Sequence, residues 1–189
     1  MPLSRWKKLT ERIVFRNAWW TYKLDTYALP SGIQGEYNYV HTNGSSMVIP
    51  VAPDGRVLMV NQYRYLAERE SLEFPCGSVK DGSSYDETAW LELAEETGHS
   101  SNRYFLAGAF NPYNGVTDEM CHVYIARELY PVASTPDITE EFELVPLTAA
   151  EIDGKIRSGE IWDGMSIAAW AIVKAKVNLD PPAGPEGGR

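Results

Sequence analysis

Short apolar runs rich in Tyr, Val, Thr and Trp recur along this chain between polar turn residues, which predicts a protein rich in β-strands. Aromatic and β-branched residues are typical of strands. The turn residues Pro53, Asp54 and Gly55 separate two of these runs and predict a hairpin. The predicted strands are residues 19–29, 35–41, 46–52, 56–65, 104–110, 120–126 and 143–147.

Three segments follow the helical period instead. Residues 85–97 are predicted to be a helix because Ser84 opens a capping-box pattern before them and Gly98 follows as a C-terminal cap. Residues 148–158 and 166–177 also have helical periodicity, and the second segment is apolar over most of its surface. Strands flanked by a few helices predict an α/β fold of the α+β kind, arranged as an α/β/α sandwich.

The composition suits one globular domain. The chain has 189 residues, of which 44% are hydrophobic and 23% are charged, so it can bury a core without disulfides. Residues 46–178 are predicted to form this domain, and residues 1–45 are too short to bury a core alone. Residues 179–189 are rich in Pro and Gly and are predicted to be a disordered tail.

The net charge of −9 argues against two classes of partner. A nucleic-acid backbone and an anionic membrane surface are both negatively charged, and both need a basic protein surface. The chain has two cysteines and no apolar run of about 18 residues, so neither a disulfide framework nor a membrane span is predicted. We therefore expect a cytoplasmic protein that acts on a small molecule.

An acidic cluster on the first predicted helix indicates a metal site. Six acids and no basic residue lie between Lys80 and Arg103. Glu95 and Glu96 follow Glu92 by three and four positions, so the three carboxylates project from one side of the helix and repel one another. A divalent cation would relieve this repulsion, and Mg2+ or Mn2+ suits carboxylate and phosphate oxygens best. The alternative interpretation is a solvated acidic helix face.

The segment before this helix suits the close approach of a ligand to the backbone. Glu73 is followed by Phe, Pro, Cys76 and Gly77, and Pro and Gly leave bare main chain where a strand ends. The main-chain carbonyl of Cys76 is therefore a candidate metal ligand. The thiol of the same residue is expected to be a small packing group.

These residues resemble the box GX5EX7REUXEEXGU of the Nudix hydrolases. Three positions depart from the box, because Ser83 replaces its first Glu, Leu91 replaces its Arg, and His99 replaces an aliphatic residue. The Glu and the Arg are lost together, so no unpaired charge remains. The positions that match in register are Gly77, Glu92, Leu93, Glu95, Glu96 and Gly98.

The resemblance covers about residues 5–178 and points to the branch of ADP-ribose and nucleotide-sugar pyrophosphatases. Arg64 ends a Gln-x-Arg strand, and Glu73 opens a segment similar to Glu-Leu-Pro-Ala-Gly. Residues 111–119 resemble a Pro-Gly-Ser-Asp-Glu loop, and residues 156–163 resemble the C-terminal pattern of that branch. The resemblance implies a Nudix-type α/β/α sandwich with a mixed sheet and an N-terminal antiparallel β extension that packs across a homodimer.

The activity implied by the resemblance is metal-dependent hydrolysis of a pyrophosphate bond. The substrate is a nucleoside diphosphate linked to another group, of the ADP-ribose or nucleotide-sugar type. The products are a nucleoside monophosphate and a phosphorylated moiety. Glu92 and Glu95 are the implied catalytic acids of the helix. The implied metal ligands are Glu92, Glu96 and the carbonyl of Cys76, with Glu95 bridging a second metal or its water molecules.

The resemblance also implies an acid from the segment before the last predicted strand. Glu140 occupies the position expected for this distal catalytic and metal-binding acid. The catalytic base has no clear counterpart, so Glu141 and Glu119 are both candidates. A solvated loop is the alternative interpretation for Glu140 and Glu141.

Substrate contacts are implied at several further positions. Arg64 is expected to bind a substrate phosphate, because a guanidinium suits bidentate contact with phosphate, and its alternative is a surface salt bridge. Trp19, Trp20 and Tyr37 lie in the region where this branch stacks a nucleobase, and their alternative is core packing. The remaining substrate-binding candidates are Glu73, Gly77 and Glu119.

The departures from the box leave a second function open. A Nudix-fold module that binds metal and nucleotide could have lost turnover, or become a ligand sensor, through Ser83 and Leu91. Retention of Glu92, Glu95 and Glu96 favours the enzyme.

Overall fold

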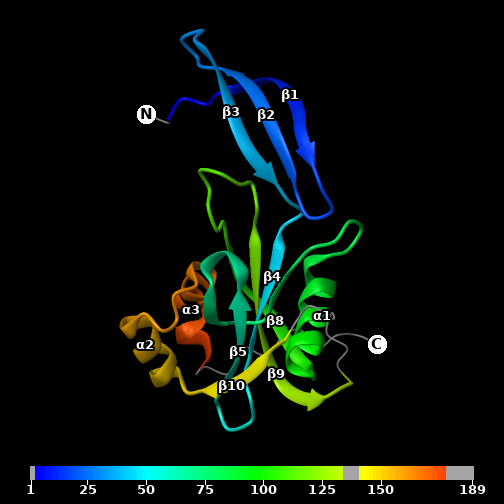
Figure 1. Cartoon of the computed structure of the whole chain (residues 1–189), viewed down its shortest axis with the longest axis vertical. Helices are drawn as coiled ribbons and strands as arrows, with labels where there is room; N and C mark the ends of the chain where they lie inside the picture. The colour runs from blue at the N-terminus through cyan, green and yellow to red at the C-terminus, as the bar shows by residue number, and fades with distance from the viewer. Residues whose placement is uncertain (1–2, 134–140, 178–189) are drawn as a thin grey trace.

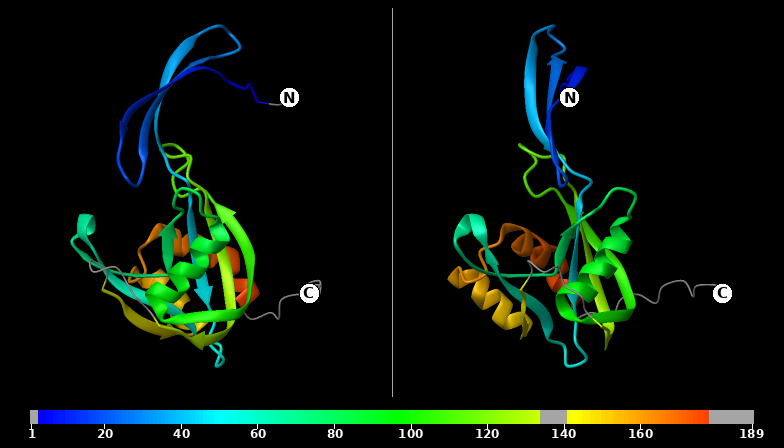
Figure 2. Two further views of the ribbon diagram at one scale, coloured as in Figure 1. Left: turned by 90° about the vertical axis from the view of Figure 1, so that its right-hand side faces the viewer. Right: turned by 45° about the vertical axis from the view of Figure 1, so that its right-hand side comes forward.

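The computed structural model describes residues 3–133 and 141–177. Within these residues the chain forms three β-sheets and three α-helices. The N-terminal sheet stands away from the body of the molecule, and the other two sheets and the helices form that body (Figures 1 and 2). The predicted tail, residues 179–189, lies outside the described residues, as does Glu140. No helix in the described ranges combines the length and apolarity needed to cross a membrane.

The N-terminal extension is a three-stranded antiparallel sheet in the order β1-β2-β3. It contacts the body through β3, where the amide of Val40 donates a hydrogen bond to the carbonyl of Val116 at 2.8 Å. The first strand was not predicted, because charged residues occupy many of its positions. The strands are β1 (Lys7–Arg16), β2 (Thr21–Ala28) and β3 (Gln34–His41).

A mixed four-stranded sheet forms the centre of the body, in the order β7-β4-β9-β8. Its two inner strands, β4 and β9, run parallel, and each pairs with an antiparallel edge strand. Successive side chains of a strand point to opposite faces. In β4 both faces are buried, because Met47 and Ile49 belong to one hydrophobic core and Val48 to another. The strands are β4 (Ser45–Pro50), β7 (Cys76–Ser78), β8 (His99–Phe110) and β9 (Cys121–Pro131).

Different elements cover the two faces of this sheet (Figure 1). Helix α1 (Tyr85–Thr97) covers one face and packs Leu93 into the smaller core with Val48. The opposite face carries the larger core, which includes Met59 from a second sheet, of order β10-β5-β6, and Trp170 from α3. The predicted α/β/α arrangement with a mixed sheet is confirmed. The other elements are β5 (Val57–Arg64), a 3-10 helix (Tyr65–Ala67), β6 (Arg69–Glu73), β10 (Glu143–Leu147), α2 (Ala149–Ser158) and α3 (Gly164–Val177).

Local signals define both ends of α1. The amide of Glu87 donates to Oγ of Ser84 at 3.1 Å, and the amide of Ser84 donates to the Glu87 carboxylate at 2.8 Å. Gly98 ends the helix in the left-handed conformation, with φ of 67°. The predicted capping box and helix bounds are therefore confirmed, and the acids of α1 have a fixed register against β7.

Candidate active site

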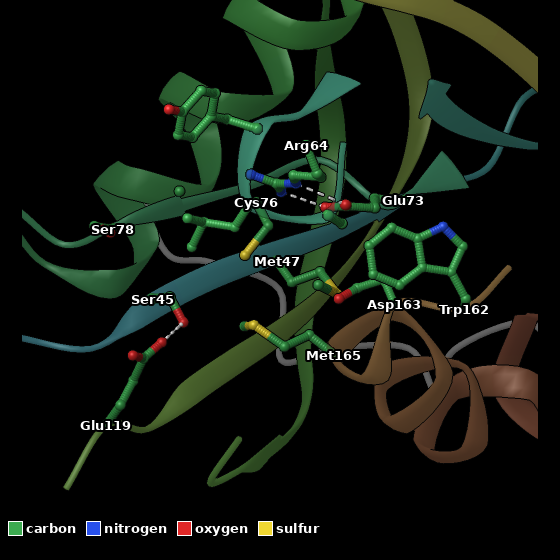
Figure 3. A pocket seen from close by; sticks show the side chains of 14 residues that line it. Ser45, Met47, Arg64, Glu73, Cys76, Ser78, Glu119, Trp162, Asp163 and Met165 are labelled. Atoms are coloured by element: carbon green, nitrogen blue, oxygen red, sulfur yellow. Dashed lines mark hydrogen bonds and ion pairs between the residues drawn. The ribbon is translucent and has the colours of Figure 1, made fainter. Parts of the chain in front are cut away.

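A pocket of about 640 Å³ opens between the mixed sheet, the β5–β6 hairpin and the start of α3 (Figure 3). Its wall combines residues from segments that lie far apart in the sequence. The pocket therefore brings together five of the predicted site residues, which are Arg64, Glu73, Cys76, Gly77 and Glu119.

Arg64 and Glu73 form a bidentate ion pair at one side of the pocket. Nε of Arg64 donates to Oε1 of Glu73 at 2.8 Å, and Nη2 donates to Oε2. Glu73 is buried, with 4% of the residue exposed. Hydrogen bonds to Glu73 raise the pKa of Arg64, and the charges of Asp163 and Glu96 raise it further. Glu73 therefore holds the guanidinium in place, and Arg64 keeps its charge beside the pocket.

Glu92 lies directly against Gly77. A β-carbon built on Gly77 would be 1.8 Å from Oε1 of Glu92 and 2.2 Å from its carboxyl carbon. The φ angle of Gly77 is not in the left-handed region, so space rather than backbone conformation requires a glycine here. This contact brings the acidic side of α1 to the edge of the pocket.

A second acid of α1 acts electrostatically on two residues that line the pocket, Arg64 and Cys76. Glu96 is buried at 9% exposure. The neighbouring Cys121 thiol and burial raise the pKa of Cys76 well above its usual value. The negative charges of Glu96 and Glu92 raise that pKa further. Both carboxylates are therefore within electrostatic range of Cys76, whose thiol is held neutral.

Glu119 lines the pocket at the end of the loop that precedes β9. Oγ of Ser45 donates to Oε1 of Glu119 at 2.7 Å, and the amide of Glu119 donates to Oγ1 of Thr117 at 3.1 Å. These two contacts fix the carboxylate beside β4. Figure 3 shows Glu119 and Trp162 on opposite sides of the pocket, with Cys76 and Met47 between them.

A known protein family matches the part of this chain that contains these site residues. The family model described as NUDIX domain matches residues 41–163, which include Gly77, Glu92 and the strands and helix that hold them. The chain belongs to the Nudix family. The enzyme class predicted from the box, a Nudix hydrolase, is confirmed, and the substitutions at Ser83 and Leu91 do not remove the chain from this family.

Two curated relatives and one solved structure extend the comparison. An ADP-ribose pyrophosphatase from Bacillus subtilis is 28% identical over 180 residues, covering 92% of this chain and 97% of that protein. A GDP-mannose pyrophosphatase from Yersinia enterocolitica is 30% identical over 138 residues, covering 68% of this chain and 72% of that protein. The crystal structure of an ADP compounds hydrolase has a TM-score of 0.81 at 21% identity, covering 93% and 95% of the two chains, so it shows the Nudix fold.

Divalent metal ions are generally used by Nudix hydrolases, and the residues of this site fit such an ion. Glu92 and Glu96 are hard oxygen donors, and Gly77 leaves bare backbone beside Glu92. Within residues 3–133 and 141–177, no three acidic, histidine or cysteine side chains are gathered as a metal-binding group. The assignment of Glu92, Glu95, Glu96 and the Cys76 carbonyl as ligands therefore stays a prediction.

The two acids expected before the last strand are only partly described. Glu140 lies outside the described residues. Glu141 is exposed, ahead of β10, and is not among the residues that line the pocket. Their catalytic roles stay predictions, and Glu119 is the base candidate that lies in the pocket wall.

The predicted nucleobase-stacking residues lie outside this pocket. Trp19 and Trp20 are 75% and 39% exposed at the turn after β1. Tyr37 lines a separate depression with Tyr39, and its hydroxyl donates to the carbonyl of Gly115 at 3.1 Å. One chain therefore does not bring these rings to Arg64, and their contact with substrate stays a prediction.

Trp162 and Asp163 line the pocket but were not predicted as site residues. Oδ2 of Asp163 accepts a hydrogen bond from the amide of Ser166 at 2.7 Å, so Asp163 caps the start of α3. The sequence signal was the segment 156–163, which resembles the C-terminal pattern of the family. That resemblance assigned no role to either side chain.

Proposed function

We propose that this chain hydrolyses the pyrophosphate bond of ADP-ribose or a nucleotide sugar. The products would be a nucleoside monophosphate and a sugar phosphate. The contact between Glu92 and Gly77 at the edge of a pocket that also contains Arg64 carries this proposal. The ADP-ribose and GDP-mannose pyrophosphatases among the relatives support the substrate class.

The pocket residues have distinct proposed roles. Arg64 binds a substrate phosphate, because a guanidinium carries five N–H groups and the contact with Glu73 uses only part of them. Glu92, Glu96, Glu95 and the Cys76 carbonyl, with Glu140, would hold Mg2+ or Mn2+. When bound, such an ion neutralises phosphate oxygens and lowers the pKa of a coordinated water. Glu119 is positioned by Ser45 to accept a proton from a water in the pocket.

We propose a homodimer formed through the N-terminal sheet. Large apolar side chains of this sheet are exposed within one chain, among them Leu9 at 40%, Ile13 at 48% and Phe15 at 53%. Contiguous exposed apolar surface marks interaction sites. A dimer would also allow Trp19, Trp20 and Tyr37 to approach a partner's pocket and stack a nucleobase.

Analytical ultracentrifugation tests this dimer. Phe15→Glu should give monomers, because it places a charge on the face of the N-terminal sheet that the dimer would bury. Tyr130→Glu on β9, where Tyr130 is 41% exposed, is the matched control and should remain dimeric. A wild-type chain that sediments as a monomer would refute the proposal.

The cellular setting follows from composition. Both cysteines, Cys76 and Cys121, are free thiols, which suits a reducing compartment, so we propose the cytoplasm. The net charge of −9 disfavours nucleic acid and anionic membranes as partners.

A substrate screen tests the activity. Purified protein is incubated with ADP-ribose, GDP-mannose and other nucleotide sugars, with Mg2+ or Mn2+, and products are separated by ion-exchange chromatography. Release of nucleoside monophosphate, lost in Glu92→Gln, is expected. The relatives do not favour a binding module that has lost turnover. Binding of these compounds without any product would instead support that module.

A further inference from the structure

One wall of the pocket is an indole ring held in place by two contacts. Nε1 of Trp162 donates a hydrogen bond to the carbonyl of Glu70 at 3.1 Å. The guanidinium carbon of Arg69 lies over the same ring, 3.9 Å from its centroid. A hydrogen bond fixes the edge of the ring, and the cation contacts its face. The indole is therefore preorganised without any contact from a ligand.

The remaining surface of the indole is available to the pocket. Trp162 is only partly buried and lines the pocket, whereas Arg69 is not one of the lining residues. Figure 3 shows the ring beside Asp163, on the side of the pocket where Arg64 and Glu73 meet.

The indole and the proposed phosphate-binding group are connected through one hairpin. Arg64 ends β5 and pairs with Arg69, the first residue of β6. The same hairpin therefore presents Arg64 to the pocket and supplies Arg69 and Glu70 to the indole. A phosphate on Arg64 would have its next substituent close to Trp162.

We propose that Trp162 is a specificity-determining residue that packs against the sugar ring carried by the second phosphate of the substrate. A sugar ring has an apolar C–H face, which suits an indole surface, and hydroxyls at its edge, which suit the adjacent carboxylate of Asp163. This inference rests on the proposed function, because it assumes a nucleoside diphosphate linked to a sugar.

The position of Trp162 separates the sugar from the nucleoside. Glu119 lies on the opposite side of the pocket from Trp162 (Figure 3). A linear substrate would then place its nucleoside toward Glu119, its diphosphate near Arg64, and its sugar on Trp162.

Binding of the two products tests this assignment separately from turnover. Affinities for ribose 5-phosphate and AMP are measured by calorimetry, with Mg2+, for wild type, Trp162→Ala, Trp162→Leu and Trp162→Phe. Trp162→Ala should weaken the binding of ribose 5-phosphate by about tenfold, equivalent to about 1.4 kcal/mol, and leave the affinity for AMP unchanged. Trp162→Phe should restore most of the affinity, whereas Trp162→Leu should restore less, because the flat ring is absent.

Steady-state kinetics supplies a second readout. Trp162→Ala should raise the KM for ADP-ribose by about tenfold with a smaller change in kcat, as expected for lost binding of a remote group. Tyr130→Ala is the control, because Tyr130 is an exposed aromatic residue that is absent from the pocket wall.

The outcomes that overturn the proposal are distinct. Weaker AMP binding with unchanged ribose 5-phosphate would assign the indole to the nucleobase instead. Unchanged affinity for both products in Trp162→Ala would leave the ring without a role in binding. A wild-type protein that hydrolyses no nucleotide sugar would refute the proposed function, and the calorimetry would still decide what Trp162 binds. Melting curves of Trp162→Phe and Trp162→Leu show whether any loss reflects unfolding.

Discussion

Oε1 of Glu92 lies where a side chain on Gly77 would have to be, 1.8 Å from the position of its β-carbon. Heavy atoms that are not bonded cannot approach so closely, so these two residues are matched in space. Gly77 belongs to β7 and Glu92 to α1, and both fall on the family box. A glycine at this position of the box therefore leaves the space that the Glu92 carboxylate occupies.

Replacing Gly77 with Ala should displace the Glu92 carboxylate and lower kcat by about 100-fold, since a displacement near 1 Å can have that effect. The fold should remain, because the side chain of Glu92 can move. Activity is measured with the best substrate of the screen. Gly154→Ala on α2 is the control, because no atom lies within 4 Å of its β-carbon position, and it should keep full activity. Unchanged kcat in Gly77→Ala would show that the position of Glu92 is unimportant.

Glu92→Gln and Glu96→Gln should each reduce hydrolysis by at least about 100-fold, because an amide is a poor ligand for a divalent cation. Without metal, stability should be unchanged or slightly higher, since like charges on one helix face repel. Urea unfolding and product assays measure the two effects. Glu36→Gln, on the N-terminal sheet, is the control and should change neither the stability nor the rate of hydrolysis. Wild-type turnover in both pocket variants would remove these acids from the proposed metal site.

Mg2+ or Mn2+ should stabilise the fold. Ligand at 100 times its dissociation constant adds about 2.7 kcal/mol to the free energy of unfolding. For a domain of this size that corresponds to a rise in Tm of about 5 to 10 °C. Scanning calorimetry measures the rise, which EDTA should reverse and Glu92→Gln should reduce. An identical Tm with and without millimolar metal would contradict the site.

Restoring the box should raise the rate if orientation of Glu92 limits it. Leu91 is 42% exposed and Ser83 is also exposed, so Leu91→Arg alone should be tolerated by the fold. Leu91→Arg combined with Ser83→Glu should show a favourable coupling of about 0.2 to 1 kcal/mol in the free energy of unfolding, which is the range of surface ion pairs. A double-mutant cycle measures this coupling, together with kcat, which is expected to rise several-fold in the double variant.

Leu91→Lys combined with Ser83→Glu is the control for that cycle. It restores the charge without the planar fork of a guanidinium, so a smaller gain is expected. Additive stabilities and an unchanged kcat in the Arg variant would mean that the altered box does not limit activity, and that Arg64 or another group already orients the site.

The sequence alone was sufficient to predict the bounds of α1 and the positions of its acids along the helix. The ends of this helix depend on contacts between residues a few positions apart, such as Ser84 with Glu87, and local patterns report such contacts directly. The sandwich followed from the pattern of strands and helices, and the mixed sheet from the family resemblance. Short strands such as β7 were missed. A strand of three residues is too short to show a recognisable pattern of apolar and polar positions.

Contacts across the fold could be decided only by the tertiary structure. The register of β5 and β6 puts Arg69 opposite Arg64, yet the Arg64 side chain reaches Glu73 at the other end of β6. Trp162 meets Arg69 because the segment before α3 packs on that hairpin. No spacing in the sequence encodes these distances. The sequence by itself therefore determined the family, the acidic helix and the class of chemistry, because these depend on local order and residue type. The tertiary structure alone decided that Glu92 occupies the space beside Gly77 and that an indole forms the pocket wall, because packing brings distant residues together.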